Sequence, residues 1–197
     1  MKETFSEAIK LKDGILYNLP YHQKRIDKTQ ARFGGEKIIL SEVLSILPDY
    51  VKSGFFKCRI EYGILIERIE FIPYAFRAIN KVTTIVDDSI DYRFKYTNRL
   101  RLEELLKKSG CDDIIVIRQG LITDSFSSNL VFESENGFFT PDSCLLHGTK
   151  RQSLLDSKKI TEKRITVNDI SSYSRIHFVN AMIDIEDNIY IDIKDIL

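Results

Sequence analysis

Residues 120–132 read GLITDSFSSNLVF, and this stretch contains the clearest fold signal in the chain. GLIT and NLVF are short apolar runs, which predict two strands. Asp124 and three serines lie between them, Asn129 begins the second run, and these residue types favour a tight turn. The sequence therefore predicts a hairpin with a carboxylate at the end of its first strand. An Asx-type turn is the commoner role for such a carboxylate, and contact with a bound cofactor is the alternative.

The composition is that of a globular protein with a core, since 43% of the 197 residues are hydrophobic and 29% are charged. The formal net charge is zero, which argues against nucleic acid or a membrane surface as a partner, because both attract basic proteins. No long apolar run occurs, so we expect neither a signal peptide nor a membrane span. The three cysteines and three histidines are scattered, so we expect no metal, no disulfide framework and a cytoplasmic location.

The first half of the chain alternates between strand and helix patterns. Asn18 can cap a helix that Gly34 or Gly35 ends, and a stretch with helical apolar spacing follows from residue 37 and stops near Pro48. We expect a hairpin around Asp13-Gly14, helices over 18–34 and 37–48, and paired strands over 55–63 and 64–74.

The second half is richer in strands. Residues 78–92 have no periodic pattern and are expected to be irregular, and an amphipathic helix follows over 95–110. We then expect strands over 112–120, 121–124, 129–134 and 137–142, a short helix after Gly148, a buried strand over 176–183 and an exposed strand over 188–193. This order predicts an α+β fold of two lobes, an N-terminal α/β lobe over 1–88 and a strand-rich lobe over 89–197.

Lys95, in YRFKYTNR, is the first candidate for chemistry. It lies among Tyr92, Phe94 and Tyr96, and burial beside such rings would lower the pKa of its amine. A neutral amine is what a Schiff-base lysine requires. The commoner alternative is a surface lysine whose stem packs along the rings while its charge stays in water.

Three other places carry polar groups that suit an anion or a buried partner. Arg25 lies on the predicted first helix, and its guanidinium can fork onto a phosphate. Gly148-Thr149 begins a helix whose backbone N–H groups can seat an anion, with Lys150 and Arg151 adding charge. Asn180-Ala181 places an amide in an apolar strand, where it needs partners. Each place has an ordinary alternative as a solvated helix face, a helix cap or a satisfied amide.

The order of these signals resembles the class IV, or fold-type IV, pyridoxal-phosphate-dependent aminotransferase family. SEAIKLKDGILYNLPYHQKRI, from residue 6, is similar to the family's F-E-T-I…G-x-I-x-x-L-x-x-H-x-x-R-L entry. ITDSFSSNLVF resembles I-T-E-x-x-x-S-N-I-F-F, and LLHGTKRQSLL resembles L-x-G-I-T-R-x-x-L-L. KYTNR and FVNAMI are closest to the K-H-x-N-R and C-N-A-L-M patterns of the 4-amino-4-deoxychorismate lyase branch. The resemblance spans about residues 6–185, and no GxSxG, Walker, HExxH or GxGxxG pattern competes with it.

The resemblance implies the fold and the roles of individual residues. The fold would be two-lobed, with a strand-rich pseudo-barrel carrying most of the site. Lys95 would bind pyridoxal 5'-phosphate as a Schiff base and then act as general base and acid. Asp124 would pair with the pyridine nitrogen, and Arg25 would bind the phosphate. The implied cofactor site comprises Arg25, Lys95, Asp124, Ser128, Asn129, Gly148, Thr149, Lys150, Asn180 and Ala181, with no metal.

The chain departs from the family pattern in three respects. Asp124 stands where a glutamate is usual, so the backbone would have to approach the cofactor ring more closely. Lys150 stands where a phosphate-binding threonine is usual. The family's first strand and D-R-G-x-x-x-G-D loop have no counterpart, and the segment between Gly63 and Lys95 is shorter than usual. We therefore expect an N-terminally shortened member whose cofactor half is better defined than its substrate half.

The resemblance predicts an enzyme that acts on a small amino compound. The lyase-like motifs favour pyruvate elimination from aminodeoxychorismate to give 4-aminobenzoate, a step of folate biosynthesis. A class IV aminotransferase for branched-chain or D-amino acids is the alternative, because the same residues can serve transamination. A family member that binds the cofactor, or lacks it, without turnover is the second alternative. The family also implies a homodimer, and neither nucleic acid nor a membrane is expected as a partner.

Overall fold

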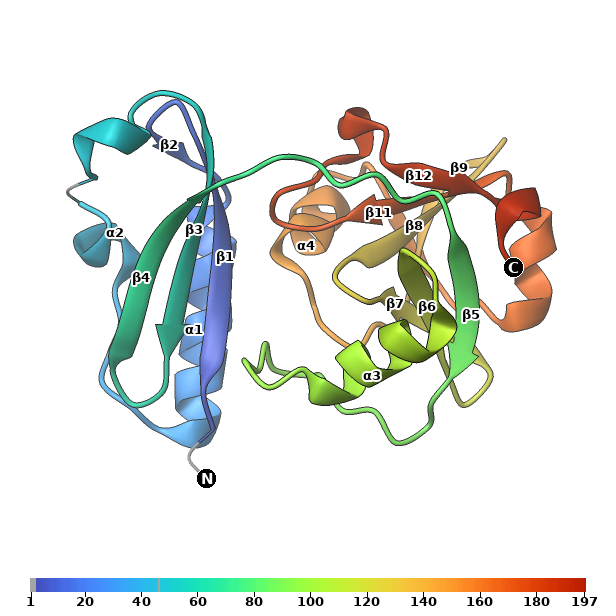
Figure 1. Ribbon diagram of the computed structural model, residues 1–197, viewed down its shortest axis with the longest axis horizontal. Coiled ribbons are helices and arrows are strands. Elements are labelled where there is room, and N and C mark those ends of the chain that lie inside the picture. Colours follow the sequence, from blue (N-terminus) through green and yellow to red (C-terminus); the bar gives the residue numbers. More distant parts are fainter. Residues whose placement is uncertain (1–2, 46) are drawn as a thin grey trace. The chain divides into compact units, whose positions relative to one another are not determined.

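The computed structural model describes residues 3–45 and 47–197, and the chain divides into two compact units (Figure 1). Unit 1 comprises Met1–Phe76 and Phe94–Asn98, and unit 2 comprises Arg77–Arg93 and Arg99–Leu197. These units differ from the predicted division between residues 88 and 89. The reason is strand pairing between residues far apart in the sequence, which a local sequence pattern does not reveal. The strand Val82–Val86 pairs within unit 2, whereas the segment around Lys95 pairs within unit 1.

Unit 1 is built on a four-stranded antiparallel sheet in the order β2-β1-β3-β4. The strands are β1 (Phe5–Lys12), β2 (Ile15–Leu16), β3 (Phe55–Tyr62) and β4 (Ile66–Pro73). The predicted hairpin at Asp13-Gly14 and the predicted pairing of β3 with β4 are both confirmed. The φ angles of Asp13 and Gly14 are 49° and 76°, and positive values at both positions are what a type I′ turn requires.

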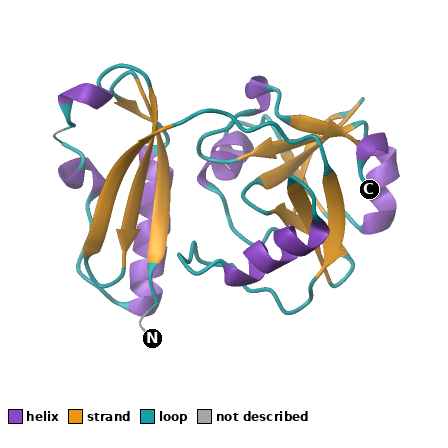
Figure 2. Ribbon diagram, in the orientation of Figure 1, coloured by secondary structure: helices purple, strands orange, loops and turns teal. Residues whose placement is uncertain are grey.

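The helix α1 (Leu19–Phe33) lies along one face of this sheet (Figures 1 and 2). Alternate residues of β1 are buried because successive side chains of a strand point to opposite faces, and Ile9 packs there in one core with Ile26 of α1. Glu7 is one of these buried positions, although its neighbours on that face are apolar. Gly34 follows the last turn as predicted, but the Asn18 side chain makes no capping hydrogen bond, so that part of the prediction is wrong.

The predicted helix over 37–48 is also wrong. Among the described residues, the structure has only the four-residue helix α2 (Leu40–Val43) there, the 3-10 turn η1 (Asp49–Val51) follows Pro48, and residue 46 lies outside the described residues. Leu40 and Val51 are nevertheless buried. The apolar spacing therefore reflected burial of an irregular segment. Pro48, whose ring fixes its φ angle, ends this segment and is the N-cap residue of η1.

Unit 2 is built on a curled eight-stranded sheet (Figure 2). β8 is its branching strand, because it pairs with β7, β9 and β11. The β5–β6 and β9–β10 pairs are parallel, and the other described pairs are antiparallel. The strands are β5 (Val82–Val86), β6 (Asp113–Arg118), β7 (Leu121–Ser125), β8 (Asn129–Ser134), β9 (Gly137–Pro141), β10 (Thr161–Lys163), β11 (Arg175–Val179) and β12 (Tyr190–Asp192).

The helices of unit 2 are α3 (Leu100–Ser109) and α4 (Thr149–Asp156), with 3-10 turns η2 (Val167–Ser172), η3 (Ile185–Asp187) and η4 (Ile193–Asp195). The predicted β6–β9 strands and both helices are confirmed, although α3 begins at Leu100 and not at residue 95. Two other expectations are wrong: β5 forms within the segment expected to be irregular, and β11 ends at Val179 and not at residue 183. Among the described residues, no helix is long and apolar enough to cross a membrane.

Candidate active site

Asp124 lies at the end of β7, where it pairs in register with Asn129 of β8. Its side chain is buried, and both carboxylate oxygens accept hydrogen bonds. Oδ1 accepts from Nδ2 of Asn129 at 2.8 Å, and Oδ2 accepts from the backbone N–H of Leu146 at 2.9 Å. Burial raises the pKa of Asp124 to about 6, although these hydrogen bonds and the charge of Arg151 act in the opposite direction. A buried carboxylate with this pKa favours a cationic partner.

Residue 148 must be glycine because a neighbouring side chain lies where its Cβ would be, and not because of its backbone conformation. Its φ is −67°, which any residue can adopt, but a Cβ at this position would lie 1.9 Å from Oδ1 of Asn129. Asn129 is fixed in turn, because its Nδ2 also donates to the carbonyl oxygen of Leu146 at 2.8 Å. Asp124, Asn129 and Gly148 therefore form one packed group at the start of α4.

The first turn of α4 is the candidate anion seat. Gly148 occupies the N-cap position and supplies no capping side chain, and Thr149 follows it as the first helical residue, buried to 4% exposure. The ammonium group of Lys150 is paired with the carboxylate of Asp184. Backbone N–H groups at a helix start carry partial positive charge, so this turn can receive a phosphate.

Asn180 and Ala181 lie beside this group in a turn that follows β11. The Asn180 side chain accepts from the backbone N–H groups of Met182 and Ile183, and its Nδ2 donates to Oγ of Ser128 at 3.0 Å. The amide expected inside a strand is thus a turn-forming residue whose polar atoms are satisfied. It joins the turn after β11 to the turn between β7 and β8.

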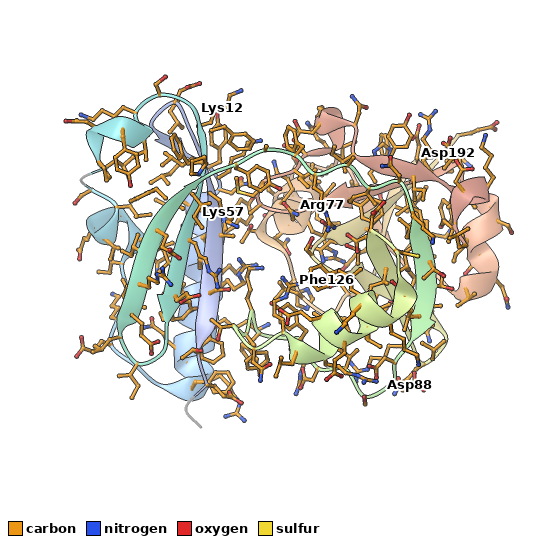
Figure 3. All side chains as sticks on the ribbon, viewed as in Figure 1. Lys12, Lys57, Arg77, Asp88, Phe126 and Asp192 are labelled. Carbon is orange, nitrogen blue, oxygen red and sulfur yellow. The ribbon has the colours of Figure 1, made fainter. Side chains whose placement is uncertain are left out.

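Arg99 fastens the same β7–β8 turn from the segment that precedes α3. Its guanidinium donates to the backbone carbonyl of Phe126, which Figure 3 labels. Its Cζ lies 4.2 Å from the centroid of the Phe126 ring. Sequence reasoning assigned Arg99 only to the KYTNR pattern and missed this contact. The pairing joins residues 27 positions apart and has no local signal.

Lys95 belongs to unit 1, where its segment extends the sheet beside β1. The backbone N–H of Ser6 donates to the carbonyl oxygen of Lys95 at 2.8 Å, and Phe5 and Tyr96 form a β-bridge. Thr97 donates its N–H to the carbonyl oxygen of Thr4 at 2.9 Å. The lysine is therefore held by an extended, hydrogen-bonded segment and not by the first turn of a helix.

Arg25, also in unit 1, is held by Glu7. Nε of Arg25 donates to Oε1 of Glu7 at 2.8 Å, Nη2 donates to Oε2, and His22 contacts Oε2 through Nδ1. Burial acts to raise the pKa of Glu7, but Arg25 and His22 outweigh it and hold the pKa at about 2. Burial lowers the pKa of His22, Glu7 opposes this, and the charges of Arg25 and Lys95 lower it further. These four residues form one electrostatic cluster.

Sequence reasoning missed Glu7, although a signal existed. Glu7 occupies an inward-facing position in the alternation of β1, where a charged residue needs a buried counterion. The predicted site residues thus fall into two groups, each assembled within one unit. Unit 1 holds Arg25 and Lys95, and unit 2 holds Asp124, Ser128, Asn129, Gly148, Thr149, Lys150, Asn180 and Ala181.

The family described as Amino-transferase class IV matches residues 65–185, and the chain belongs to this family. This membership supports a pyridoxal-phosphate-dependent enzyme.

Individual relatives are similar to this chain over most of its length. A protein of Haemophilus influenzae described as uncharacterized is 30% identical over 180 residues, which cover 89% of this chain and 96% of that protein. A solved structure from Haemophilus somnus 129PT, provisionally named a 4-amino-4-deoxychorismate lyase, is 32% identical with a TM-score of 0.84, and the match covers 92% of this chain and 97% of that one. The branched-chain amino acid aminotransferase of Escherichia coli has a TM-score of 0.71 at 12% identity, over 98% of this chain and 76% of that one. The predicted fold class is confirmed.

Proposed function

We propose that the chain binds pyridoxal 5'-phosphate through Lys95 and acts as a 4-amino-4-deoxychorismate lyase-like enzyme. The observation that carries the proposal is the packed group of Asp124, Asn129 and Gly148. Its buried carboxylate has a pKa of about 6, and a cation such as a protonated pyridine would lower that pKa. Gly148 supplies no capping side chain at the start of α4, so the backbone N–H groups of this turn can receive an anion. The residues present therefore fit the cofactor.

Each residue has a role that follows from its chemistry. When bound, pyridoxal phosphate supplies an electron sink for the carbon that bears the substrate amine. Asp124 would hold the proton on the ring nitrogen, and Asn129 would keep Asp124 oriented. Lys95 would hold the cofactor covalently and then, as a free amine, accept the proton from the amine-bearing carbon.

Pyridoxal phosphate can serve several reactions, so the choice of the lyase reaction is a separate part of the proposal. The lyase assignment rests on the KYTNR and VNAMI patterns and on the provisional name of the 32%-identical relative. Loss of the proton and departure of the enolpyruvyl group as pyruvate would leave an aromatic amine, 4-aminobenzoate. This reaction would place the enzyme in folate biosynthesis.

An aminotransferase for branched-chain or D-amino acids is the second candidate, because the family includes both activities and the same residues can carry either. A member without turnover is the third candidate. We also propose a homodimer in the cytoplasm that acts without nucleic acid or membrane as a partner. Light scattering of the purified protein tests the dimer.

The first experiment compares visible absorption of wild type and Lys95→Ala after addition of pyridoxal phosphate. A band near roughly 410 nm in wild type, absent from the variant, is expected for a Schiff base on Lys95. Reduction with borohydride and peptide mass spectrometry should then place the cofactor on Lys95. Absence of the band from wild type would refute the cofactor proposal.

The second experiment separates the candidate reactions. Pyruvate and 4-aminobenzoate released from aminodeoxychorismate, with no keto acid added, are expected of the lyase. Turnover only when a keto acid acceptor is present would instead establish an aminotransferase. The Lys95-dependent band without either turnover would favour the third candidate.

A further inference from the structure

Lys150 is a cation at an unfavourable place. It lies in the first turn of α4, directly after Thr149, where the helix dipole is positive and repels cations. Its side chain is only 12% exposed, so water gives its charge little screening. A buried ammonium at a helix start is stable only with an anion close to it, and Asp184 is the anion that the structure provides.

Asp184 does not depend on Lys150 for its hydrogen bonds. It caps the 3-10 turn η3, and its Oδ1 accepts from the backbone N–H of Ile185 at 3.1 Å. In the reciprocal capping box, the Asp184 side chain also accepts from the backbone N–H of Asp187, and the backbone N–H of Asp184 donates to Oδ2 of Asp187 at 2.8 Å. If Lys150 moves away, the carboxylate therefore keeps backbone partners, so the ion pair can open without leaving the Asp184 side chain without a hydrogen bond.

We propose that the Lys150–Asp184 pair is an exchangeable counterion at the cofactor's phosphate seat. Lys150 leaves Asp184 to bind the phosphate, and Asp184 sets how tightly the phosphate is held. This inference rests on the proposed function. The family pattern has a neutral threonine hydroxyl at this position, whereas this chain offers a full charge together with its own competitor. The phosphate and the Asp184 carboxylate consequently compete for the ammonium group of Lys150.

An ordinary structural pair predicts something different. If Lys150 only ties α4 to η3, its removal lowers stability and affects all cofactor analogues alike. Exchange predicts that Lys150 matters only for ligands that carry a phosphate. It also predicts that removal of the Asp184 charge strengthens binding, and only when Lys150 is present.

The test uses the full-length protein and titrates pyridoxal phosphate and pyridoxal, which lacks the phosphate. Dissociation constants are measured by absorbance for wild type, Lys150→Met, Asp184→Asn and the double variant. Asparagine is a good helix cap, so Asp184→Asn removes the charge and keeps η3. Lys159→Met is the matched control, because Lys159 is also an ion-paired lysine of unit 2, with Glu186 at 2.6 Å.

We expect Lys150→Met to raise the dissociation constant of pyridoxal phosphate about tenfold or more, as for loss of a hydrogen bond to a charged group. The dissociation constant of pyridoxal should stay unchanged, and Lys159→Met should match wild type for both ligands. Asp184→Asn should lower the constant for pyridoxal phosphate about threefold, and this gain should vanish in the double variant. Equal weakening of both ligands by Lys150→Met, or an Asp184→Asn gain that persists without Lys150, would overturn the inference.

A second arm keeps this inference separable from the proposed function. Inorganic phosphate should raise the melting temperature of wild type and not of Lys150→Met, whether or not a Schiff base forms. A Lys95-dependent band with no Lys150 effect on either phosphate ligand would overturn the exchange and leave the proposed function standing. A stabilising effect of phosphate that depends on Lys150, without an absorption band in wild type, would support the exchange and refute the proposed function.

Discussion

Gly148→Ala should disrupt the candidate site by steric conflict alone. A Cβ at this position would lie 1.9 Å from Oδ1 of Asn129, a separation that real structures do not tolerate, so Asn129 must move. Its movement would break the 2.8 Å hydrogen bonds to Asp124 and to the carbonyl oxygen of Leu146. A hydrogen bond to a charged group contributes about 1.5–3 kcal/mol, and overpacking costs about 1–3 kcal/mol. We expect a loss of about 3 kcal/mol or more in unfolding free energy.

The assay is urea unfolding of the protein without cofactor, with Gly110→Ala as the contrasting variant. Gly110 has a φ of 63°, and a Cβ added there would meet no atom within 4 Å, so its substitution measures backbone strain alone, about 1 kcal/mol. Gly148 has an ordinary φ, so its cost must come from contact. In an Asn129→Ala background the conflict disappears, and Gly148→Ala should then cost little. A loss below about 1 kcal/mol in wild type, or a loss undiminished in that background, would refute the reasoning.

Two further predictions concern buried carboxylates, and unfolding measured across pH tests both. The pKa of Glu7 falls from 4.5 to about 2 on folding, so its stabilisation of about 3 kcal/mol is present above pH 4.5 and is lost as pH falls toward about 2. Glu7→Gln should make the unfolding free energy depend less on pH between about 2 and 4.5, and an unchanged pH dependence would contradict this role of Glu7. The pKa of Asp124 rises from 3.8 to about 6, so ionisation destabilises the cofactor-free protein as pH rises through this range. Asp124→Asn should therefore raise the melting temperature at pH 8 relative to wild type and not at pH 4, while it weakens cofactor binding; equal shifts at both pH values would count against the burial argument.

Elements with local chemical signals could be predicted from the sequence. The Asp13-Gly14 turn follows from residues that accept positive φ, and the end of α1 follows from Gly34. The hairpin of β7 and β8 followed from two apolar runs around a polar turn. The strand β5 was missed because its five residues are stabilised by parallel pairing with β6, which a short window does not contain.

The order of motifs along the chain was enough to indicate the family and to select Lys95, Arg25 and Asp124 for the candidate site. These signals are short patterns of residue types, and they can be recognised in the sequence without knowledge of the fold. The partners of these residues were not visible in the same way. Glu7 binds Arg25 across 18 positions, and Asp184 binds Lys150 across 34.

Only the tertiary structure decided those pairings, because buried charges choose partners by proximity after the strands and helices have packed. It also decided why residue 148 must be glycine, since the limiting contact comes from Asn129 of β8 and not from the glycine's own φ. The sequence by itself determined the kinds of side chain and their order. Packing determined which of them meet, how deeply each is buried and therefore what charge each can carry.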